Sequence, residues 1–507
     1  MMHLPIMPIL VPLIAAIACM AAGSLAMQRR LSFAAALAMF PVAIFLLASA
    51  ASDNILVYVL GSWPAPFGII LVADRLSALM VTLSTLLAAL VLCDAAGGGT
   101  DAGGRHFHAL FQFQIAGING AFLTGDLFNL FVFFEILLLA SYGLLAHGHG
   151  REKARASLAY VVLNLSASVL FLIAVALLYG TLGTLNLADM ARAFGRIPAG
   201  SEALAGTAVT LLFIVFALKA ALLPLCLWLP RVYSAASAPV AALFAIMTKV
   251  GIYCILRMST TLFTEAPAAA GSVSAWLMPL AIGTVVIGAI GVLASGRLAM
   301  IIANLVVVST GVLLVAIATG TVEATAAGLY YLPHTTLATA AFFLLAAWIG
   351  RQRGEVGDAL VAGPALPEAA ATGTLYLILA VTVSGMPPFS GFIGKLMVLQ
   401  SIRDTAAGPW AWVAILASGL VAMLVLARTA SLFFWEPRAE AGTPIVARSA
   451  WQGTAILLLV LAGPLLAAAA SPLADYALAT ARQLHAGAAY GAAVFGAEAG
   501  SEFRRPQ

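Results

Sequence analysis

Long apolar stretches recur along nearly the whole chain and are separated by short polar segments. Each has about 20 residues, the length that an α-helix needs to cross the hydrocarbon core of a bilayer. The stretches are apolar on every side, unlike the alternating strands of a membrane β-barrel. We therefore predict an all-α membrane protein with about fourteen transmembrane helices, at 4–27, 31–51, 75–96, 107–123, 126–147, 155–180, 205–229, 238–262, 272–295, 299–319, 325–350, 371–402, 410–436 and 450–475.

The segment at 55–72 breaks this pattern. It contains Trp63, Pro64 and Pro66 between β-branched residues, which predicts a short hairpin at the membrane surface. The first apolar run is too long for a simple signal peptide, so we expect a retained first helix. After Ala474 the chain becomes rich in Ala and Gly, which is consistent with one more short interfacial helix.

The composition agrees with a membrane protein, since 63% of the residues are hydrophobic and 9% are charged. A soluble domain carries about 25% charged residues. The net charge of +4 is spread out, and no basic run indicates binding to nucleic acid. Lys and Arg gather in alternate loops, which predicts a multi-pass protein of the bacterial inner membrane with both termini in the periplasm.

Two predicted spans contain helix-breaking residues near their middle. The seventh holds KAALLP at 219–224, and the twelfth holds GMPPFSG at 385–391. Proline removes a backbone donor, so we expect helices 7 and 12 to be broken. A matched pair of broken helices indicates two inverted five-helix repeats around an ion route. The predicted division is an N-terminal three-helix segment with a periplasmic hairpin (1–106), a first repeat (107–265), a second repeat (266–440), and a C-terminal helix and tail (441–507).

Lysine is the clearest chemical signal. The chain has four lysines, and Lys219, Lys249 and Lys395 lie inside apolar spans whereas Lys153 lies in a loop. A lysine at the centre of a bilayer costs about 3 kcal/mol on insertion scales, so buried lysines indicate function. Snorkelling to the membrane surface is the alternative, and it fits Lys395 better than the other two.

Glu135 and His334 are the other ionisable candidates. Glu135 lies deep in an apolar run and is a natural partner for Lys219, either in a switchable ion pair or in a static pair that fixes helix packing. His334 follows a proline inside an apolar span and can pass protons or be a satisfied core residue. The hydroxyl groups of Ser309, Thr310 and Thr339 could hold water in a chain, or bond to their own backbone.

The remaining polar residues have simpler interpretations. Asp126 is expected to cap a helix, and Asp74 with Arg75 to form a boundary ion pair. The histidines at 106, 108, 147 and 149 are expected to be solvated loop residues rather than metal ligands, and the four cysteines to be packing residues. With no phosphate-binding motif in a suitable context, we expect no cofactor, no metal and no enzymatic activity.

These motifs resemble the D-type membrane component of Mrp-type (also called Mnh or Pha) multisubunit monovalent cation/proton antiporters, a group related to the antiporter-like membrane subunits of respiratory complex I. The resemblance covers most of the chain up to about residue 435. The residues that carry it are GSWPAPFGI at 61–69, VADRLSALM at 72–80, GDLFNL at 125–130 with Glu135, 219–224 with WLP at 228–230, TKVG at 248–251, and 385–388 with Lys395.

The resemblance implies a fourteen-helix fold with two inverted repeats. It implies a proton route through Glu135, Lys219, Lys249 and Lys395, and partner subunits with which the protein exchanges Na⁺ or K⁺ for H⁺. Relatives often carry an aspartate after the helix-11 histidine and a lysine five residues after it. Here these positions are Thr335 and Thr339, so the centre of the relay rests on His334 and water.

Two other functions stay open. The chain could be a proton-pumping membrane subunit of an NADH-quinone oxidoreductase-like complex, or a scaffold with vestigial charges. The hairpin at 63–69 favours the antiporter over the oxidoreductase.

Overall fold

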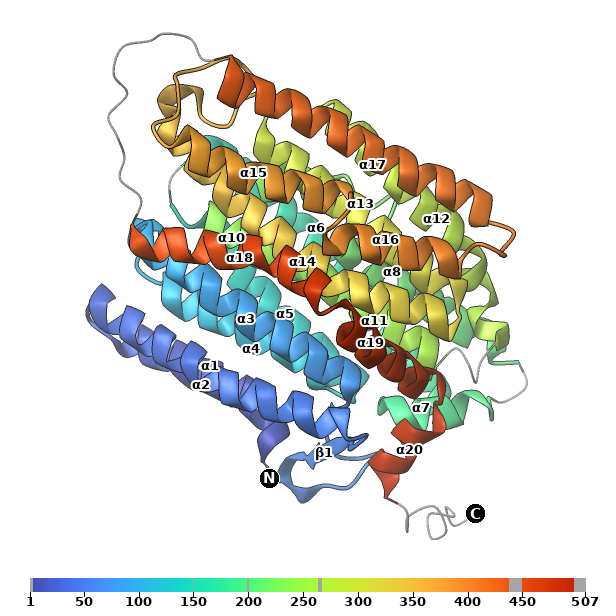
Figure 1. Cartoon of the computed structure of the whole chain (residues 1–507). Coiled ribbons are helices and arrows are strands. Elements are labelled where there is room, and N and C mark those ends of the chain that lie inside the picture. The colour runs from blue at the N-terminus through green and yellow to red at the C-terminus, as the bar shows by residue number, and fades with distance from the viewer. Residues whose placement is uncertain (1–2, 149, 198–199, 263–266, 437–448, 497–507) are drawn as a thin grey trace.

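The computed structural model describes residues 3–148, 150–197, 200–262, 267–436 and 449–496. Helices dominate this part of the chain (Figure 1). The elements in chain order are α1 (Met7–Ala21), α2 (Leu25–Ala51), β1 (Leu56–Val59), β2 (Ile70–Ala73), α3 (Arg75–Gly97), α4 (Phe107–Leu123), α5 (Leu127–Ala146), α6 (Arg151–Leu182), α7 (Leu187–Phe194), α8 (Glu202–Ala220), α9 (Trp228–Ala235), α10 (Ala238–Phe244), α11 (Met247–Thr261), α12 (Pro267–Leu293), α13 (Leu298–Thr319), α14 (Val322–Gln352), α15 (Ala369–Ser384), α16 (Ser390–Ser401), α17 (Gly408–Ala430), α18 (Ala450–Ala468), α19 (Ala470–His485) and α20 (Ala488–Phe495).

Twelve helical stretches of the described chain are long and apolar enough to cross a membrane. Each coincides with one of the predicted spans, which confirms a multi-pass helical membrane protein. The two other predicted spans, 107–123 and 371–402, contain α4, with 17 residues, and the pair α15 and α16, with 16 and 12 residues. The expected total of fourteen crossings therefore stays a prediction.

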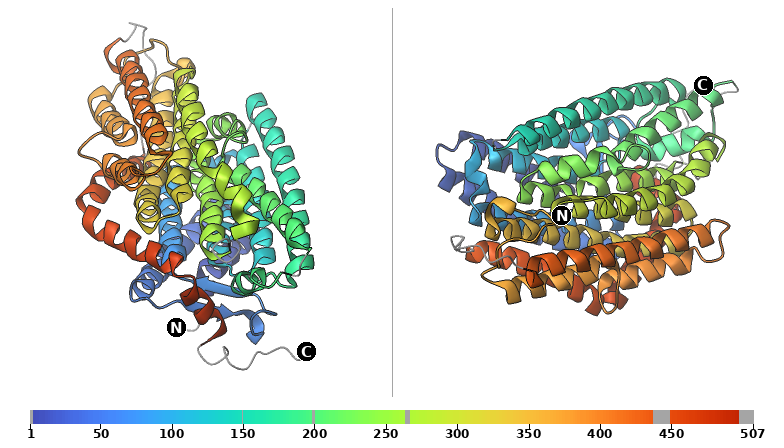
Figure 2. Two further views of the ribbon diagram at one scale, coloured as in Figure 1. Left: turned by 90° about the vertical axis from the view of Figure 1, so that its right-hand side faces the viewer. Right: turned by 90° about the horizontal axis from the view of Figure 1, so that it is seen from above.

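Burial separates central helices from outer ones. The most apolar part of Ala238–Thr261, which comprises α10 and α11, is 100% buried, and the corresponding part of Leu298–Thr319 is 94% buried. Helices α6 and α17 are far less buried and lie on opposite sides of the bundle (Figure 2). A helix that is apolar on all sides and surrounded by other helices forms the core of a membrane bundle.

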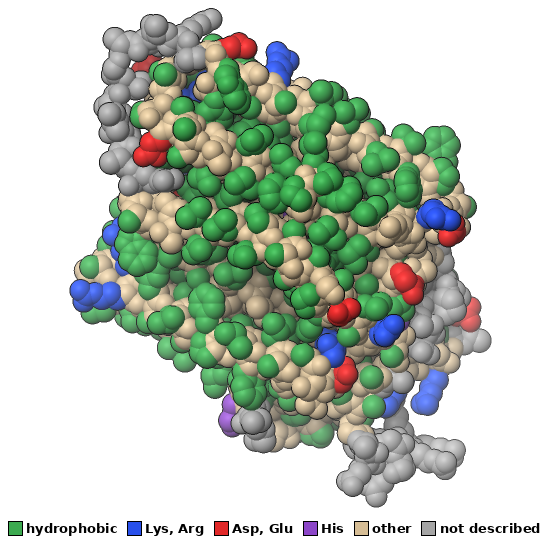
Figure 3. Space-filling view, in the orientation of Figure 1, with side chains coloured by type: hydrophobic (Ala, Val, Ile, Leu, Met, Phe, Trp, Pro, Cys, Tyr) green, Lys and Arg blue, Asp and Glu red, His purple; other side chains and the backbone are tan. Residues whose placement is uncertain are grey.

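Apolar side chains cover the outer face between the two ends of the bundle, and charged side chains gather toward its margins (Figure 3). This is the distribution that a lipid-facing belt requires, because charged groups at membrane depth are costly. Large apolar side chains on α6 and α17 are exposed, including Leu158, Val169, Val413 and Leu420.

The predicted hairpin is confirmed, and its place at the membrane surface stays a prediction. Strands β1 and β2 pair antiparallel with Val57 opposite Val72. The turn between them exposes Trp63 and Phe67. We call the end of the molecule that carries this hairpin the hairpin end. Both ends of the described chain lie there, since the first helical turn (Leu4–Ile6) and α20 each contact β1.

The predicted pair between Asp74 and Arg75 is wrong. Asp74 caps α3, and its carboxylate binds the guanidinium of Arg257 on α11 at 2.6 Å. Arg75 instead binds the exposed carboxylate of Asp53 at 2.9 Å. Neighbouring residues at a helix start point in different directions, so they seldom pair with each other.

The two proline-containing segments lie between helices. Helix α8 ends at Ala220, followed by Ala221 with a left-handed φ of 60°, and α9 begins at Trp228. Helix α15 ends at Ser384, followed by Gly385 with φ of 81°, and α16 begins at Ser390. Whether these segments are equivalent breaks in two repeats stays a prediction.

Helices α8 and α11 approach each other closely at Gly251. A Cβ atom at this position would lie 2.4 Å from the backbone nitrogen of Ala220, so only glycine fits without a backbone shift. This contact brings the segments that carry Lys219 and Lys249 together.

We predict that Gly251→Val weakens the packing of α8 on α11 by about 1–3 kcal/mol, the usual cost of overpacking a core. The melting temperature of the protein purified from membranes should fall. Gly180→Val on exposed α6 is the control, since no atom of the described chain outside its own helix lies within 4 Å of a Cβ there. Equal melting temperatures for the two variants would contradict this interpretation.

Candidate functional site

Lys219 lies in the last turn of α8 and its side chain is buried. Its ammonium group donates a hydrogen bond of 2.9 Å to Oδ1 of Asn164 on α6. It also lies 5.8 Å from the centre of the Phe134 ring on α5. A neutral amide oxygen and an aromatic face therefore surround the charge where water would otherwise solvate it.

Glu135 on α5 is half-buried, and its carboxylate accepts a hydrogen bond from the hydroxyl of Ser168. Ser168 and Asn164 are four residues apart on α6, so they lie on the same face of that helix. No ion pair within 4.0 Å joins Glu135 to Lys219 among the described residues. The charge of Glu135 still acts on Lys219 through space.

The predicted partnership of Glu135 and Lys219 is therefore indirect. One turn of α6 separates the two groups and presents a hydroxyl to one and an amide to the other. Asn164 and Ser168 were missed in the sequence analysis. Two polar residues spaced by four in an otherwise apolar helix were the available signal.

Lys249 on α11 has no exposed surface. Its ammonium nitrogen has no hydrogen-bond partner among the residues that the structure describes. Most buried polar groups in proteins are hydrogen-bonded, so this exception distinguishes Lys249 from the other two buried lysines. Lys219 and Lys395 each donate hydrogen bonds to protein oxygens, whereas Lys249 donates none among the described residues.

Lys395 on α16 binds the end of another helix. Its ammonium group donates to the carbonyl oxygens of Ser384 at 2.9 Å and Val383 at 3.2 Å. These carbonyls belong to the last turn of α15, where oxygens lack partners within the helix. The partial negative charge of a helix C-terminus favours a cation at this position. Lys395 is buried, which argues against snorkelling.

His334 on α14 lies between two of the lysines. Its Nδ1 is 2.9 Å from the hydroxyl of Ser390, the first residue of α16. The charges of Lys395 and Lys249 both act on its ring. Ser390 was not singled out in the sequence analysis, because nothing in the sequence indicates that α14 and α16 pack together.

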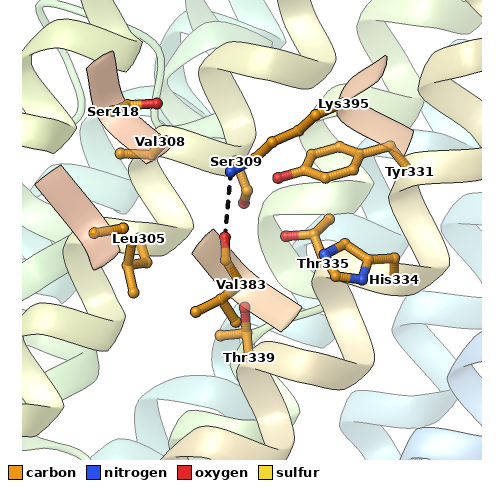
Figure 4. A pocket seen from close by; sticks show the side chains of 11 residues that line it. Leu305, Val308, Ser309, Tyr331, His334, Thr335, Thr339, Val383, Lys395 and Ser418 are labelled. Atoms are coloured by element: carbon orange, nitrogen blue, oxygen red, sulfur yellow. Dashed lines mark hydrogen bonds between the residues drawn. The ribbon is translucent and has the colours of Figure 1, made fainter. Parts of the chain in front are cut away.

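A small cavity lies beside His334 and Lys395 (Figure 4). Its volume of about 20 Å³ exceeds the roughly 10–15 Å³ that one water molecule needs. The hydroxyl groups of Tyr331 and Thr335 point toward the side of the cavity where the Lys395 ammonium group and Ser309 lie (Figure 4). The polar lining comprises Ser309, Tyr331, His334, Thr335, Thr339, Lys395 and Ser418.

Pairwise contacts and electrostatic interactions link the five predicted site residues, which we call the row in the order Glu135, Lys219, Lys249, His334 and Lys395. Polar side chains of α6 contact both Glu135 and Lys219. The close approach at Gly251 joins the segment of Lys219 to that of Lys249. His334 and Lys395 line the same cavity. Its members lie on α5, α8, α11, α14 and α16. The role of these residues in proton transfer stays a prediction.

The expectation of solvated loop histidines is wrong for His108 and His147, which are buried, whereas His106 is exposed and His149 lies outside the described residues. His108 is fully buried rather than solvated, and its Nε2 lies 3.0 Å from the carboxylate of Asp101. Burial opposes ionisation of Asp101, but hydrogen bonds from Arg29 and His108 outweigh it and lower the pKa of Asp101 to about 2. A buried carboxylate requires hydrogen-bond donors, which explains the burial of His108.

Within the described ranges, no group of three or more His, Cys, Asp or Glu side chains could hold a metal.

Comparison with known proteins identifies relatives over nearly the full chain. The family described as "NADH:quinone oxidoreductase/Mrp antiporter, TM" matches residues 124–423. The D component of a probable K⁺/H⁺ antiporter from Rhizobium meliloti (strain 1021) is 40% identical, covering 91% of this chain and 93% of that protein. The D component of a Na⁺/H⁺ antiporter from Alkalihalophilus pseudofirmus is 34% identical, covering 96% and 97%.

A solved structure supports the same relationship. A chain in the structure of the Mrp complex from Dietzia sp. DQ12-45-1b superposes with a TM-score of 0.86 at 26% sequence identity. The match covers 98% of this chain and 100% of that one.

Proposed function

This chain belongs to the NADH:quinone oxidoreductase/Mrp antiporter family, and we propose that it is the proton-translocating membrane subunit of a multisubunit Na⁺/H⁺ or K⁺/H⁺ antiporter. In this role it is a transporter subunit and not an enzyme. The observation that carries the proposal is the row from Glu135 through Lys219, Lys249 and His334 to Lys395. In support, a shared face of α6, electrostatic interactions and a small cavity link members of this row.

The row can move protons because its members differ in the hydrogen-bond acceptors and neighbouring charges that stabilise their protonated forms. Neighbouring positive charges repel strongly where the effective dielectric constant is low. A proton on Lys219 is stabilised by Asn164 and by the charge of Glu135. Protonation of Glu135 would remove that charge and allow the Lys219 proton to pass to Lys249, which has no fixed acceptor among the described residues.

The second half of the row has a water-sized connection. His334 can exchange a proton with Ser390, and the cavity can hold one water between His334 and Lys395. Thr335 and Thr339 line this cavity, where hydroxyl groups can donate and accept hydrogen bonds. Water therefore takes the place of the acidic and basic side chains that relatives often carry here.

The surroundings of Glu135 support the proposal that another subunit packs against this part of the chain. The half-buried Glu135 side chain lies near Val132 and Leu139 on α5 and Leu165 on α6, which are exposed. A carboxyl facing lipid tails at this depth would be costly. We infer that another antiporter subunit covers this face and contributes polar groups to it.

The finer architecture is also part of the proposal. We propose that the fourth to eighth predicted spans (107–265) and the ninth to thirteenth predicted spans (266–440) are inverted repeats. The segments 1–106 and 441–507 flank them. In support, each proposed repeat has a helix that ends at a left-handed residue, Ala221 or Gly385, beside a buried lysine. Interrupted helices in matching positions are typical of such transporters.

The proposed location is the bacterial inner membrane with both termini in the periplasm. The bias of Lys and Arg toward alternate loops supports this orientation. The contacts of the first helical turn and α20 with β1 support a common side for the two ends of the described chain.

The alternative is a proton-pumping subunit of an NADH-quinone oxidoreductase-like complex. Relatives at 40% and 34% identity over nearly the whole chain are named as antiporter subunits, which favours the antiporter. Neighbouring genes for small antiporter subunits, rather than for flavin and iron–sulfur subunits, would separate the two.

We predict that Lys219→Ala in the intact complex lowers cation-dependent proton exchange by at least about tenfold, which corresponds to a barrier raised by about 1.4 kcal/mol. Exchange would be measured in vesicles with a pH-sensitive dye, with Na⁺ and K⁺ tested separately. Lys153→Ala removes the one lysine outside the row and should keep full exchange. Full exchange by an assembled Lys219→Ala complex would refute the relay.

We predict that Glu135→Gln, which keeps the shape of the side chain but not its charge, also impairs exchange, because Lys219 loses its counter-charge. Rates would be compared from acidic to alkaline pH in complexes of equal subunit content. Glu152→Gln changes a carboxylate that is 87% exposed and serves as the control. Normal exchange by Glu135→Gln at every pH would make a charge switch at α5 untenable.

A further inference from the structure

One deeply buried ion pair lies outside the proposed row. Asp74, directly after β2, and Arg257, on α11, are 2% and 5% exposed at their side chains. The guanidinium binds both carboxylate oxygens, at 2.6 Å and 3.0 Å. This bidentate geometry is the strongest form of side-chain ion pair.

The remaining polar groups of this pair are also satisfied. Arg257 donates to the hydroxyl of Tyr253 at 3.3 and 3.2 Å, and Tyr253 donates to the carbonyl of Phe122 at 2.8 Å. Asp74 accepts from the backbone nitrogen of Ser77 at 2.9 Å. Burial opposes ionisation, yet Arg257 and Ser77 hold the pKa of Asp74 below its usual value. The pair is therefore fixed, in contrast to Lys249.

The pair lies in line with the row. Lys249, Tyr253 and Arg257 follow each other at intervals of four residues, so they share one face of α11. With a rise of 1.5 Å per residue, Arg257 lies about 12 Å along the helix from Lys249, toward the hairpin end. A proton leaving Lys249 along α11 in this direction would have to pass Arg257.

The C-terminal helices cover this position. The ring of Tyr490 on α20 lies 5.5 Å from the Arg257 guanidinium. On α19, the Tyr476 hydroxyl donates to the carbonyl of Arg75 at 2.9 Å, and Gln483 accepts from the backbone nitrogen of Arg75 at 3.1 Å. The chain after α18 thus lies over the start of α3 beside the ion pair (Figure 1).

Little room for water lies beside the pair on the side of the bundle core. A cavity of about 10 Å³ there is lined mostly by apolar side chains, including Leu76, Leu256 and Leu329, with Tyr253 and Thr325 among the lining residues. This volume is at the lower limit of the roughly 10–15 Å³ that a water molecule needs, and the mostly apolar lining offers few of the polar partners that water requires.

We propose that the Asp74–Arg257 pair, with Tyr253 and Tyr490, is a plug that closes the proton route between Lys249 and the hairpin end. This inference rests on the proposed function of Lys249. Guanidinium does not give up its proton in proteins, so Arg257 cannot pass protons as a lysine does. Protons then leave Lys249 sideways, toward His334.

The test is the passive proton leak of vesicles that contain the whole complex, in a medium without Na⁺ or K⁺. The double variant Asp74→Asn with Arg257→Gln removes both charges and leaves no unpaired buried ion. Its leak should rise by at least about tenfold, which corresponds to a barrier lowered by about 1.4 kcal/mol. Tyr490→Ala removes part of the cover without touching the pair and should raise the leak less.

Asp53→Asn is the matched control, because it neutralises the partner of Arg75, a carboxylate that is 77% exposed at the same end. Its leak should equal that of the unmodified complex. Adding Lys249→Leu to the double variant should abolish the extra leak. The subunit content of each complex would be measured in parallel.

An unchanged leak in every variant that assembles would overturn the plug and leave a structural staple between α3 and α11. An extra leak that survives Lys249→Leu would also overturn it, since the opened route would not pass through the row. A failure of the proposed relay would instead appear in the exchange assay, as full cation-dependent exchange by the Lys219→Ala complex. The leak assay and the exchange assay therefore distinguish a wrong plug from a wrong relay.

Discussion

The cost of placing charge in an apolar bundle constrains this structure more than any other factor. Each buried lysine would cost about 3 kcal/mol at the bilayer centre without compensation. The fold compensates Lys219 with an amide oxygen and Lys395 with two helix-terminal carbonyls. Such carbonyls exist only where a helix ends inside the protein. The end of α15 and the burial of Lys395 are therefore two consequences of one requirement.

The compensation of buried charges is uneven, and we propose that this difference separates the groups that exchange protons from the groups that do not. Arg257 makes hydrogen bonds through all three guanidinium nitrogens, whereas the Lys249 nitrogen makes none among the described residues. A fully satisfied guanidinium stabilises one arrangement of α3 and α11. An unsatisfied amine can change its protonation state at a smaller cost, because no fixed acceptor has to be given up.

The sequence predicted most of the individual elements. Hydrophobic runs located the twelve apolar spans, and the proline-rich segment at 61–69 located the hairpin, because lipid and turn geometry act on local sequence. The same approach failed for Asp74, assigned to Arg75, and for His108, assigned to solvent. Both residues find partners that are distant in sequence or buried by packing, namely Arg257 and Asp101.

What the sequence determined by itself is which side chains are out of place in lipid: Lys219, Lys249, Lys395, Glu135 and His334. The scarcity of charge in an apolar chain makes each exception visible, since hydrophobicity is a property of residues and of their neighbours along the chain. Only the tertiary structure decided how these side chains are connected. Asn164, Ser168 and Ser390 reach them from other helices, and Gly251 allows α11 to lie against α8. Helix packing brings together residues far apart in the sequence, and hydrophobic periodicity does not record which helices meet.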